Sequence, residues 1–429
     1  SLKVDLIRHV CGDQWLQVKS IIDKCPDMVR IPLNRTRETA LHLAVREGKG
    51  GIVNELVKRM RPEDMLIPNS SGDTALHLAI RWDRLGIVKE LVNLMRPEDM
   101  LISNSYGDTA LHLAVTSQGS LDIVKELVKR MRPEHMLIPN SSGDTALHLA
   151  ICWDRLGIVK ELVNLMRPED MLISNSYGDT ALHLAVTSQG SLEIVKELVK
   201  RMRPEDMLIP NSSGDTALHL AIRWDRLGIV KELVNLMRPE DMLISNSYGD
   251  TALHLAVTSQ GSLEIVKELV KRMRPEDMQI QNSSGDTALH LAVKTYSHEI
   301  VEELGNRMRP EDMLISNSYG DTALRAAVIS QCKLEIVNEL VKRMRPEDML
   351  IPNSSGMLPL RLAAAYCYDQ RIMLDRMRQE DMLIPAEAIL DRFIDRSLVD
   401  ILFSRKVIDK MDYKDIEPLF FMTITFKMF

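Results

Sequence analysis

Aromatic residues and cysteines are scarce in this sequence of 429 residues. Aromatic side chains make up 4% of the chain, and all six phenylalanines lie at or after Phe393. The five cysteines are irregularly spaced, and no two of them form a CxxC pair: Cys11, Cys25, Cys152, Cys332 and Cys367. So few cysteines, odd in number, do not form a disulfide framework or a zinc site. We therefore expect reduced thiols and an intracellular, cytoplasmic protein.

The charge pattern argues against a nucleic-acid partner. The net charge is −7, and no long run of Lys and Arg occurs, whereas phosphate binding requires a basic surface. The local basic segments "VKRMRPED" end in Glu-Asp and are typical of a solvated helix end. No apolar run is as long as a membrane span, and no signal peptide is visible, so we expect no membrane-spanning segment.

Motifs that carry catalysis or cofactor binding are also missing. The chain contains no GxGxxG, GxxxxGK[ST], HExxH or GxSxG pattern. These motifs place phosphate-binding loops, metal ligands or an activated serine in enzymes. We expect a protein without enzymatic activity and without a cofactor.

The most prominent feature that is present is an internal repeat. A threonine followed by "ALHLA" or a variant of it recurs every 35 or 36 residues, at positions 39, 74, 109, 145, 180, 216, 251, 287 and 322, and Leu358 occupies the tenth frame. From residue 70 the repeating unit is a 71-residue pair, since "SSGD" recurs at 70, 141, 212 and 283. Residues 70–140 and 141–211 differ at only three positions, which indicates recent tandem duplication. Repeats of this length are typical of solenoids.

Each unit predicts two helices and a turn. Threonine is a good N-cap for the short apolar helix "TALHLAI". The second helix, "LGIVKELVNLM", has its apolar residues at helical spacing: Ile87, Val88, Leu91, Val92 and Met95. Next comes "RPED", whose proline suits a first helical position, and then a Gly/Asn/Ser turn. The sequence therefore predicts an all-α chain of helix-turn-helix units.

The motif "T-A-L-H-L-A" in such units resembles the ankyrin repeat, whose usual pattern is T-P-L-H-x-A. The resemblance covers residues 36–383 and implies an all-α solenoid of about ten units with projecting finger turns and terminal caps. Residues 1–35 read as a degenerate N-terminal capping repeat, and residues 384–429 as C-terminal capping helices and an apolar tail. The segment "RPEDMLIPNSSGDTALHLA" looks like plant ankyrin proteins, many of which carry a C-terminal membrane domain, and we expect this chain to be without that domain.

Eight histidines in one frame invite a metal or catalytic interpretation. Ligands of one zinc ion lie about 2.1 Å from it, whereas stacked helices are roughly 10 Å apart, so these histidines do not converge on one ion. A catalytic base needs a unique pocket and a nucleophile, not a pair repeated in every unit. The ankyrin resemblance instead implies that each histidine ties the threonine of its motif to the neighbouring turn, as does His42 with Thr39. The other members of this structural set are Thr74, His77, Thr109, His112, His148, His183, His219, His254 and His290.

The motif fails in the last two units, where Arg325 and Arg361 replace histidine. We expect the tie to be lost there. Replacing Arg325 by histidine should therefore raise stability or leave it unchanged.

The resemblance also implies where a protein partner binds, namely on the concave surface of finger tips and first-helix ends. The candidate contact residues are Asp73, Arg81, Trp82, Tyr106, Asp108, Trp153, Tyr177, Arg223, Trp224, Tyr248 and Tyr319. Tyr, Trp and Arg are enriched in binding hot spots. The tryptophans are equally consistent with packing over the "DRLG" turn, the aspartates with local hydrogen bonds, and the tyrosines with exposure at the finger tips.

The sequence therefore predicts a non-catalytic scaffold that binds a protein partner. The alternative is a structural or self-assembling protein that makes homotypic contacts through its repeats or through residues 418–429, a β-prone apolar run.

Overall fold

The computed structural model describes residues 2–117, 121–188, 192–259, 263–330, 332–345, 348 and 351. All regular structure in these residues is helical, with twenty α-helices joined by short 3-10 helices. The chain divides into two compact units, residues 1–212 and 213–429, and each is considered by itself.

The first unit contains twelve α-helices in the residues that the structure describes. These helices are α1 (Leu2–Cys11), α2 (Trp15–Lys24), α3 (Ala40–Arg46), α4 (Gly50–Val57), α5 (Ala75–Arg81), α6 (Leu85–Leu94), α7 (Ala110–Thr116), α8 (Leu121–Val128), α9 (Ala146–Cys152), α10 (Leu156–Leu165), α11 (Ala181–Thr187) and α12 (Leu192–Val199). Its 3-10 helices are η1 (Pro26–Val29), η2 (Pro62–Leu66), η3 (Pro97–Leu101), η4 (Pro133–Leu137), η5 (Pro168–Leu172) and η6 (Pro204–Leu208).

The second unit continues the same order as far as it is described. Its α-helices are α13 (Ala217–Arg223), α14 (Leu227–Leu236), α15 (Ala252–Thr258), α16 (Leu263–Val270), α17 (Ala288–Lys294), α18 (His298–Gly305), α19 (Ala323–Ile329) and α20 (Leu334–Arg343). Its 3-10 helices are η7 (Pro239–Leu243), η8 (Pro275–Gln279) and η9 (Pro310–Leu314).

The first helix of each repeat begins and ends where local chemistry dictates. In α5 the N-cap is Thr74 in extended conformation, as predicted from the sequence. The helix ends at Arg81, because Trp82 caps it and Asp83 adopts a left-handed conformation with φ of 51°. Such a short helix is stable only through its packing, and Ala75 to Ile80 are all buried.

The second helix buries one stripe. In α6 the buried residues are Ile87, Val88, Leu91 and Val92, the spacing that the sequence predicted. The helix ends before Arg96-Pro97, and Pro97 opens η3 at the position where its missing N–H costs nothing.

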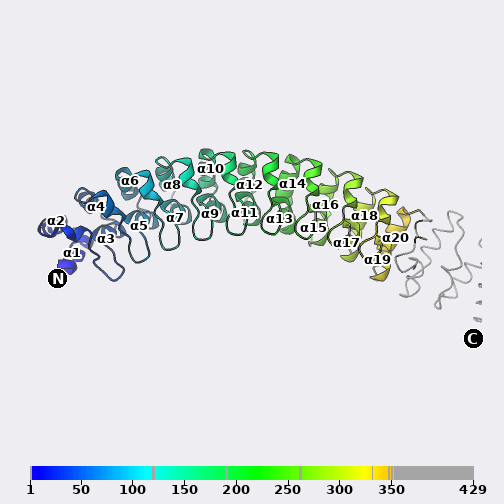
Figure 1. Ribbon diagram of the computed structural model, residues 1–429, viewed down its shortest axis with the longest axis horizontal. Coiled ribbons are helices and arrows are strands. Elements are labelled where there is room, and N and C mark those ends of the chain that lie inside the picture. The colour runs from blue at the N-terminus through cyan, green and yellow to red at the C-terminus, as the bar shows by residue number, and fades with distance from the viewer. Residues whose placement is uncertain are drawn as a thin grey trace, which may run out of the picture. The chain divides into compact units, whose positions relative to one another are not determined.

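Within each unit the helices stack in two rows. Odd-numbered helices pack on odd-numbered neighbours, for example α5 on α7 and α7 on α9, and even-numbered helices pack likewise. Figure 1 shows these rows in the first unit, with the finger turns projecting beyond the odd-numbered row. Nine helix pairs begin at the threonine frames and the α1–α2 pair precedes them. The tenth frame at Leu358 and residues 384–429 lie outside the described residues.

Candidate functional site

Each repeated histidine closes the N-terminus of its own helix. In α5, Thr74 N donates to Nδ1 of His77 over 3.0 Å, and Thr74 Oγ1 lies 2.9 Å from the same nitrogen. Because Nδ1 accepts a backbone hydrogen bond, the proton of the neutral imidazole sits on Nε2. The other threonine-histidine pairs have the same geometry: Thr39–His42, Thr109–His112, Thr145–His148, Thr180–His183, Thr216–His219, Thr251–His254 and Thr287–His290.

The second ring nitrogen faces the next repeat. His42 Nε2 donates to the carbonyl oxygen of Asp73 over 3.1 Å, and His112 Nε2 donates to that of Asp144 over 3.0 Å. His148 bonds the carbonyl of Ile173 instead. The Nε2 atoms of His77 and His219 are buried, and neither forms a hydrogen bond within the described residues. Burial lowers the pKa of these imidazoles and so keeps them neutral near pH 7.

A ladder of amides and carboxylates joins the finger turns. Asn104 Nδ2 donates to Asp73 Oδ1 of the preceding finger over 3.0 Å, while Asn104 Oδ1 accepts from the backbone N–H groups of Tyr106 and Asp108. The same bond recurs within each unit from Asn140, Asn175, Asn211, Asn246, Asn282 and Asn317. Each finger turn also requires its glycine. Gly72, which precedes Asp73, has φ of +75°, and a Cβ there would lie 2.6 Å from Ser105 N of the next finger.

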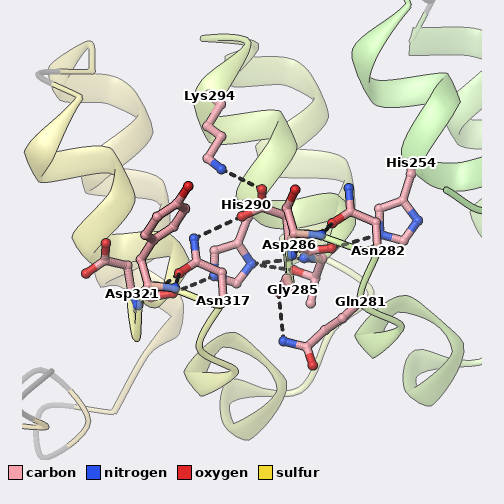
Figure 2. Close-up of polar contacts among 12 residues, drawn as sticks. His254, Gln281, Asn282, Gly285, Asp286, His290, Lys294, Asn317 and Asp321 are labelled. Atoms are coloured by element: carbon pink, nitrogen blue, oxygen red, sulfur yellow. Dashed lines mark hydrogen bonds and ion pairs between the residues drawn. The ribbon is translucent and has the colours of Figure 1, made fainter. Parts of the chain in front are cut away.

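In three of the described repeats a cation from the first-helix end completes this ladder. Arg81 Nη2 lies 3.0 Å from Asp73 Oδ2, and Arg223 Nη1 lies 2.6 Å from Asp215 Oδ2. Figure 2 shows the equivalent contact from Lys294 to Asp286, whose other oxygen accepts from Asn317.

Asp73, one of the predicted partner contacts, is engaged in the finger ladder, and its role in partner binding stays a prediction. Its residue exposure is 0%, and its carboxylate already accepts from Arg81 and Asn104. Asp108 is half-buried and accepts from Asn140. Arg81 and Arg223 are exposed at the helix ends, each with its guanidinium on an aspartate. The Asn-x-x-x-Asp spacing of the fingers was the sequence signal for these contacts, and the sequence analysis did not use it.

The "RPED" segments keep the expected solvated basic residue, since the Arg96 side chain is 74% exposed, but their aspartate is buried. Asp99 is buried, and its Oδ2 accepts from Arg96 N at 3.0 Å and from Arg96 Nε at 3.2 Å. The hydrogen bond from the Arg96 guanidinium lowers the pKa of Asp99. These arginines are therefore neutralised within their own turn.

Exposed aromatic rings lie at two repeated positions. The tryptophans cap the C-termini of α5, α9 and α13, and Trp82, Trp153 and Trp224 are 50%, 56% and 56% exposed. The tyrosines at the finger tips are held by a backbone hydrogen bond to asparagine while their rings face solvent: Tyr106, Tyr177, Tyr248 and Tyr319. Their exposure ranges from 68% to 74%, in agreement with the expectation of exposed tyrosines.

Arg325 keeps part of the tie that was expected to be lost. It has no capping box with Thr322, but Arg325 Nη1 donates to the carbonyl of Ile351 over 3.4 Å. Its Nε lies 3.3 Å from Asp321 Oδ1. In other repeats a histidine Nε2 bonds a carbonyl of the next repeat. The longer side chain of Arg325 makes such a bond with its guanidinium instead.

The described part of the chain contains neither a cluster of metal ligands nor a membrane-spanning helix. No group of three or more His, Cys, Asp or Glu residues is arranged there to hold a metal ion. None of the helices there has the length and hydropathy needed to cross a membrane.

Comparison with known proteins agrees with this geometry. The family profile described as "Ankyrin repeats (3 copies)" matches residues 12–99, 41–136, 93–169, 120–207, 161–242, 189–276 and 253–349. Among solved structures, the ankyrin repeat domain of Bcl-3, a unique member of the IkappaB protein family, matches with a TM-score of 0.46 and 28% identity, covering 56% of this chain and 100% of that chain. No curated protein sequence matches significantly. Ankyrin repeats are generally protein–protein interaction modules, and their fold is typically non-catalytic. The chain belongs to the ankyrin-repeat family.

Proposed function

We propose that the chain is a non-catalytic, intracellular scaffold that binds a protein partner through its finger tips and first-helix ends. The single observation that carries this proposal is the row of exposed aromatic rings. Trp82, Trp153 and the finger tyrosines are half or more exposed at positions where the repeat needs no aromatic side chain for its own core. Exposed Trp and Tyr side chains supply large, stiff contact areas for a partner.

The main chain that carries these rings is fixed before any partner arrives. Trp82 N donates to the carbonyl of Leu78 over 3.0 Å, and Tyr106 N donates to Asn104 Oδ1 over the same distance. A surface fixed in this way loses little conformational entropy on binding. The repeated positions favour a long or itself repetitive protein segment as the partner.

The experiment compares two triple variants of the full chain in affinity capture followed by quantitative mass spectrometry. The first replaces Trp82, Trp153 and Trp224 by alanine. The matched control replaces three similarly exposed leucines at the ends of the second helices, which are Leu94, Leu165 and Leu236 at 51%, 43% and 42% exposure. We expect the leucine variant to retain the wild-type partners and the tryptophan variant to lose them. Equal retention by both variants would exclude the aromatic surface as the binding site.

Homotypic assembly is the second candidate. It is assigned to the repeats or to residues 418–429, and because those residues lie outside the described part of the chain, contacts through the tail stay a prediction. Sedimentation of the full chain with and without residues 418–429 tests it. A chain that is monomeric in both forms rules out association through the tail.

A further inference from the structure

One repeat lacks a cation that its sister repeats possess. In five repeats the acidic residue before the motif threonine is followed eight positions later by Arg46, Arg81, Cys152, Arg223 or Lys294. Each of the four basic residues forms an ion pair with its acid: Arg46–Glu38 at 2.6 Å, Arg81–Asp73 at 3.0 Å, Arg223–Asp215 at 2.6 Å and Lys294–Asp286 at 2.5 Å. The sister repeats thus show which ligand this carboxylate takes, a guanidinium or an ammonium.

Cys152 leaves the carboxylate of Asp144 accessible. The acids that have a cation are at most 5% exposed, whereas Asp144 is half-buried. Asp144 Oδ1 accepts from Asn175 over 2.9 Å, and no cation of the described residues pairs with the carboxylate.

The two flanking repeats extend this surface. Asp108 and Asp179 are followed eight positions later by Thr116 and Thr187, whose hydroxyls donate to carbonyls of their own helices. Both aspartates are half-buried, and neither forms an ion pair within the described residues. Three successive repeats of the first unit therefore present carboxylates without a cation of their own.

The carboxylates of Asp144 and Asp179 also affect the thiol of Cys152. Partial burial raises the pKa of the Cys152 thiol, and the negative charges of Asp144 and Asp179 raise it further. The thiol is solvent-accessible and lies in the field of carboxylates from two repeats. Beside it, Trp153 presents a ring that is 56% exposed.

We propose that Asp108, Asp144 and Asp179 bind an extended basic segment of the partner, with one of its Arg or Lys side chains at Asp144 where the sister repeats place their own cation. This proposal rests on the proposed scaffold function and names the chemistry of its partner. Helix layers are roughly 10 Å apart, and a chain in polyproline II conformation has three residues per turn and rises about 3.1 Å per residue. Cationic side chains at every third residue then lie on one face about 9 Å apart and match successive carboxylates. The Trp153 ring receives the stem or the cation of the central side chain.

The test uses fluorescence anisotropy with the full chain and a fluorescein-labelled peptide of Arg-Ser-Gly repeated three times. A second peptide has the same composition with its three arginines adjacent. The key variant is Cys152→Arg, which installs the residue of the sister repeats and so is compatible with the fold. Cys152→Ser is its matched control, and Arg81→Cys is the reciprocal change, because it uncovers Asp73.

We expect Cys152→Arg to weaken binding of the spaced peptide at least about tenfold, the effect of one charge-assisted hydrogen-bonded pair. Cys152→Ser should bind like the wild type, and Arg81→Cys should bind several-fold more tightly. Equal affinity of the wild type and Cys152→Arg, equal affinity for the two peptides, or no binding near 1 mM overturns the proposal. Those results leave the tryptophan comparison untouched, so failure of this proposal is distinguishable from failure of the scaffold function.

Discussion

The buried histidines make the stability of the first unit depend on pH, and the size of that effect follows from their number. His42, His77, His112, His148 and His183 are each at most 2% exposed. Their Nδ1 atoms accept backbone N–H bonds, so a second proton on the ring would face a donor. Burial lowers the pKa of His42, His77, His112 and His148 in the folded state.

The sign follows from where the protons bind. In the unfolded chain a histidine titrates near pH 6.5, so below that pH the unfolded state binds more protons than the folded state. Stability is therefore complete above about pH 6.5 and is lost as the pH falls towards the lower folded-state pKa. From pH 7.5 to 5.5 each of these four histidines lowers the free energy of unfolding by at most about 1.4 kcal/mol, and the four unfolding together lower it by at most about 5.5 kcal/mol.

Urea unfolding followed by circular dichroism at pH 7.5, 6.5 and 5.5 measures this quantity. The lowered pKa of Asp99 places the titration of such carboxylates at more acidic pH, outside this window. The variant His112→Gln should lose up to about 1.4 kcal/mol of the pH dependence, which is the share of one histidine. Unfolding free energies that do not change between pH 7.5 and 5.5 would refute the assignment of these histidines as buried, neutral ties.

Three further changes are expected to have defined effects. His135 stands where the sister repeat has Asp206. The Nδ1 atom of His135 accepts from Arg132 N over 3.4 Å, whereas Asp206 also binds the guanidinium of Arg203. His135→Asp should therefore raise the free energy of unfolding by about 1 kcal/mol in urea, and an unchanged midpoint contradicts this prediction. Arg325 is 1% exposed, so Arg325→His should remove a buried charge and raise the unfolding midpoint or leave it unchanged, and a clear loss means that the bond to Ile351 stabilises the stack. The Cys152 thiol should react faster with a trimethylammonium methanethiosulfonate than with the sulfonate analogue, and Asp144→Asn should reduce the ratio of rates at least about twofold, whereas an unchanged ratio contradicts the local negative potential.

The helix pairs could be predicted from the sequence because their determinants are local. Each unit has a threonine N-cap, a seven-residue apolar helix and a second helix with one buried stripe. Because these signals recur in register, each unit supports the same prediction as the unit before it. The exposure of the finger tyrosines was predictable for the same reason, since Tyr106 adjoins the glycine of a tight turn.

Contacts set by stacking could not be predicted in this way. Asp73 appeared to be a surface acid, but its partner Asn104 lies 31 residues away in the next finger. Asp99 is buried because the 3-10 turn directs it back onto the N–H of Arg96, which composition alone does not reveal. The change from Arg81 to Cys152 was visible between two nearly identical modules, but its consequence became clear only once Arg81 was found on Asp73.

We propose that the histidines hold the repeats together while the exposed aromatic rings bind the partner. Measuring partner affinity and unfolding midpoint in parallel on the Trp82→Ala, Trp153→Ala, Trp224→Ala triple variant tests it most directly. We expect affinity to fall at least about tenfold, the effect of losing hot-spot aromatics, while the unfolding free energy changes by no more than about 1 kcal/mol for each half-exposed ring. Unchanged affinity, or a loss of binding accompanied by unfolding of the stack, contradicts the claim.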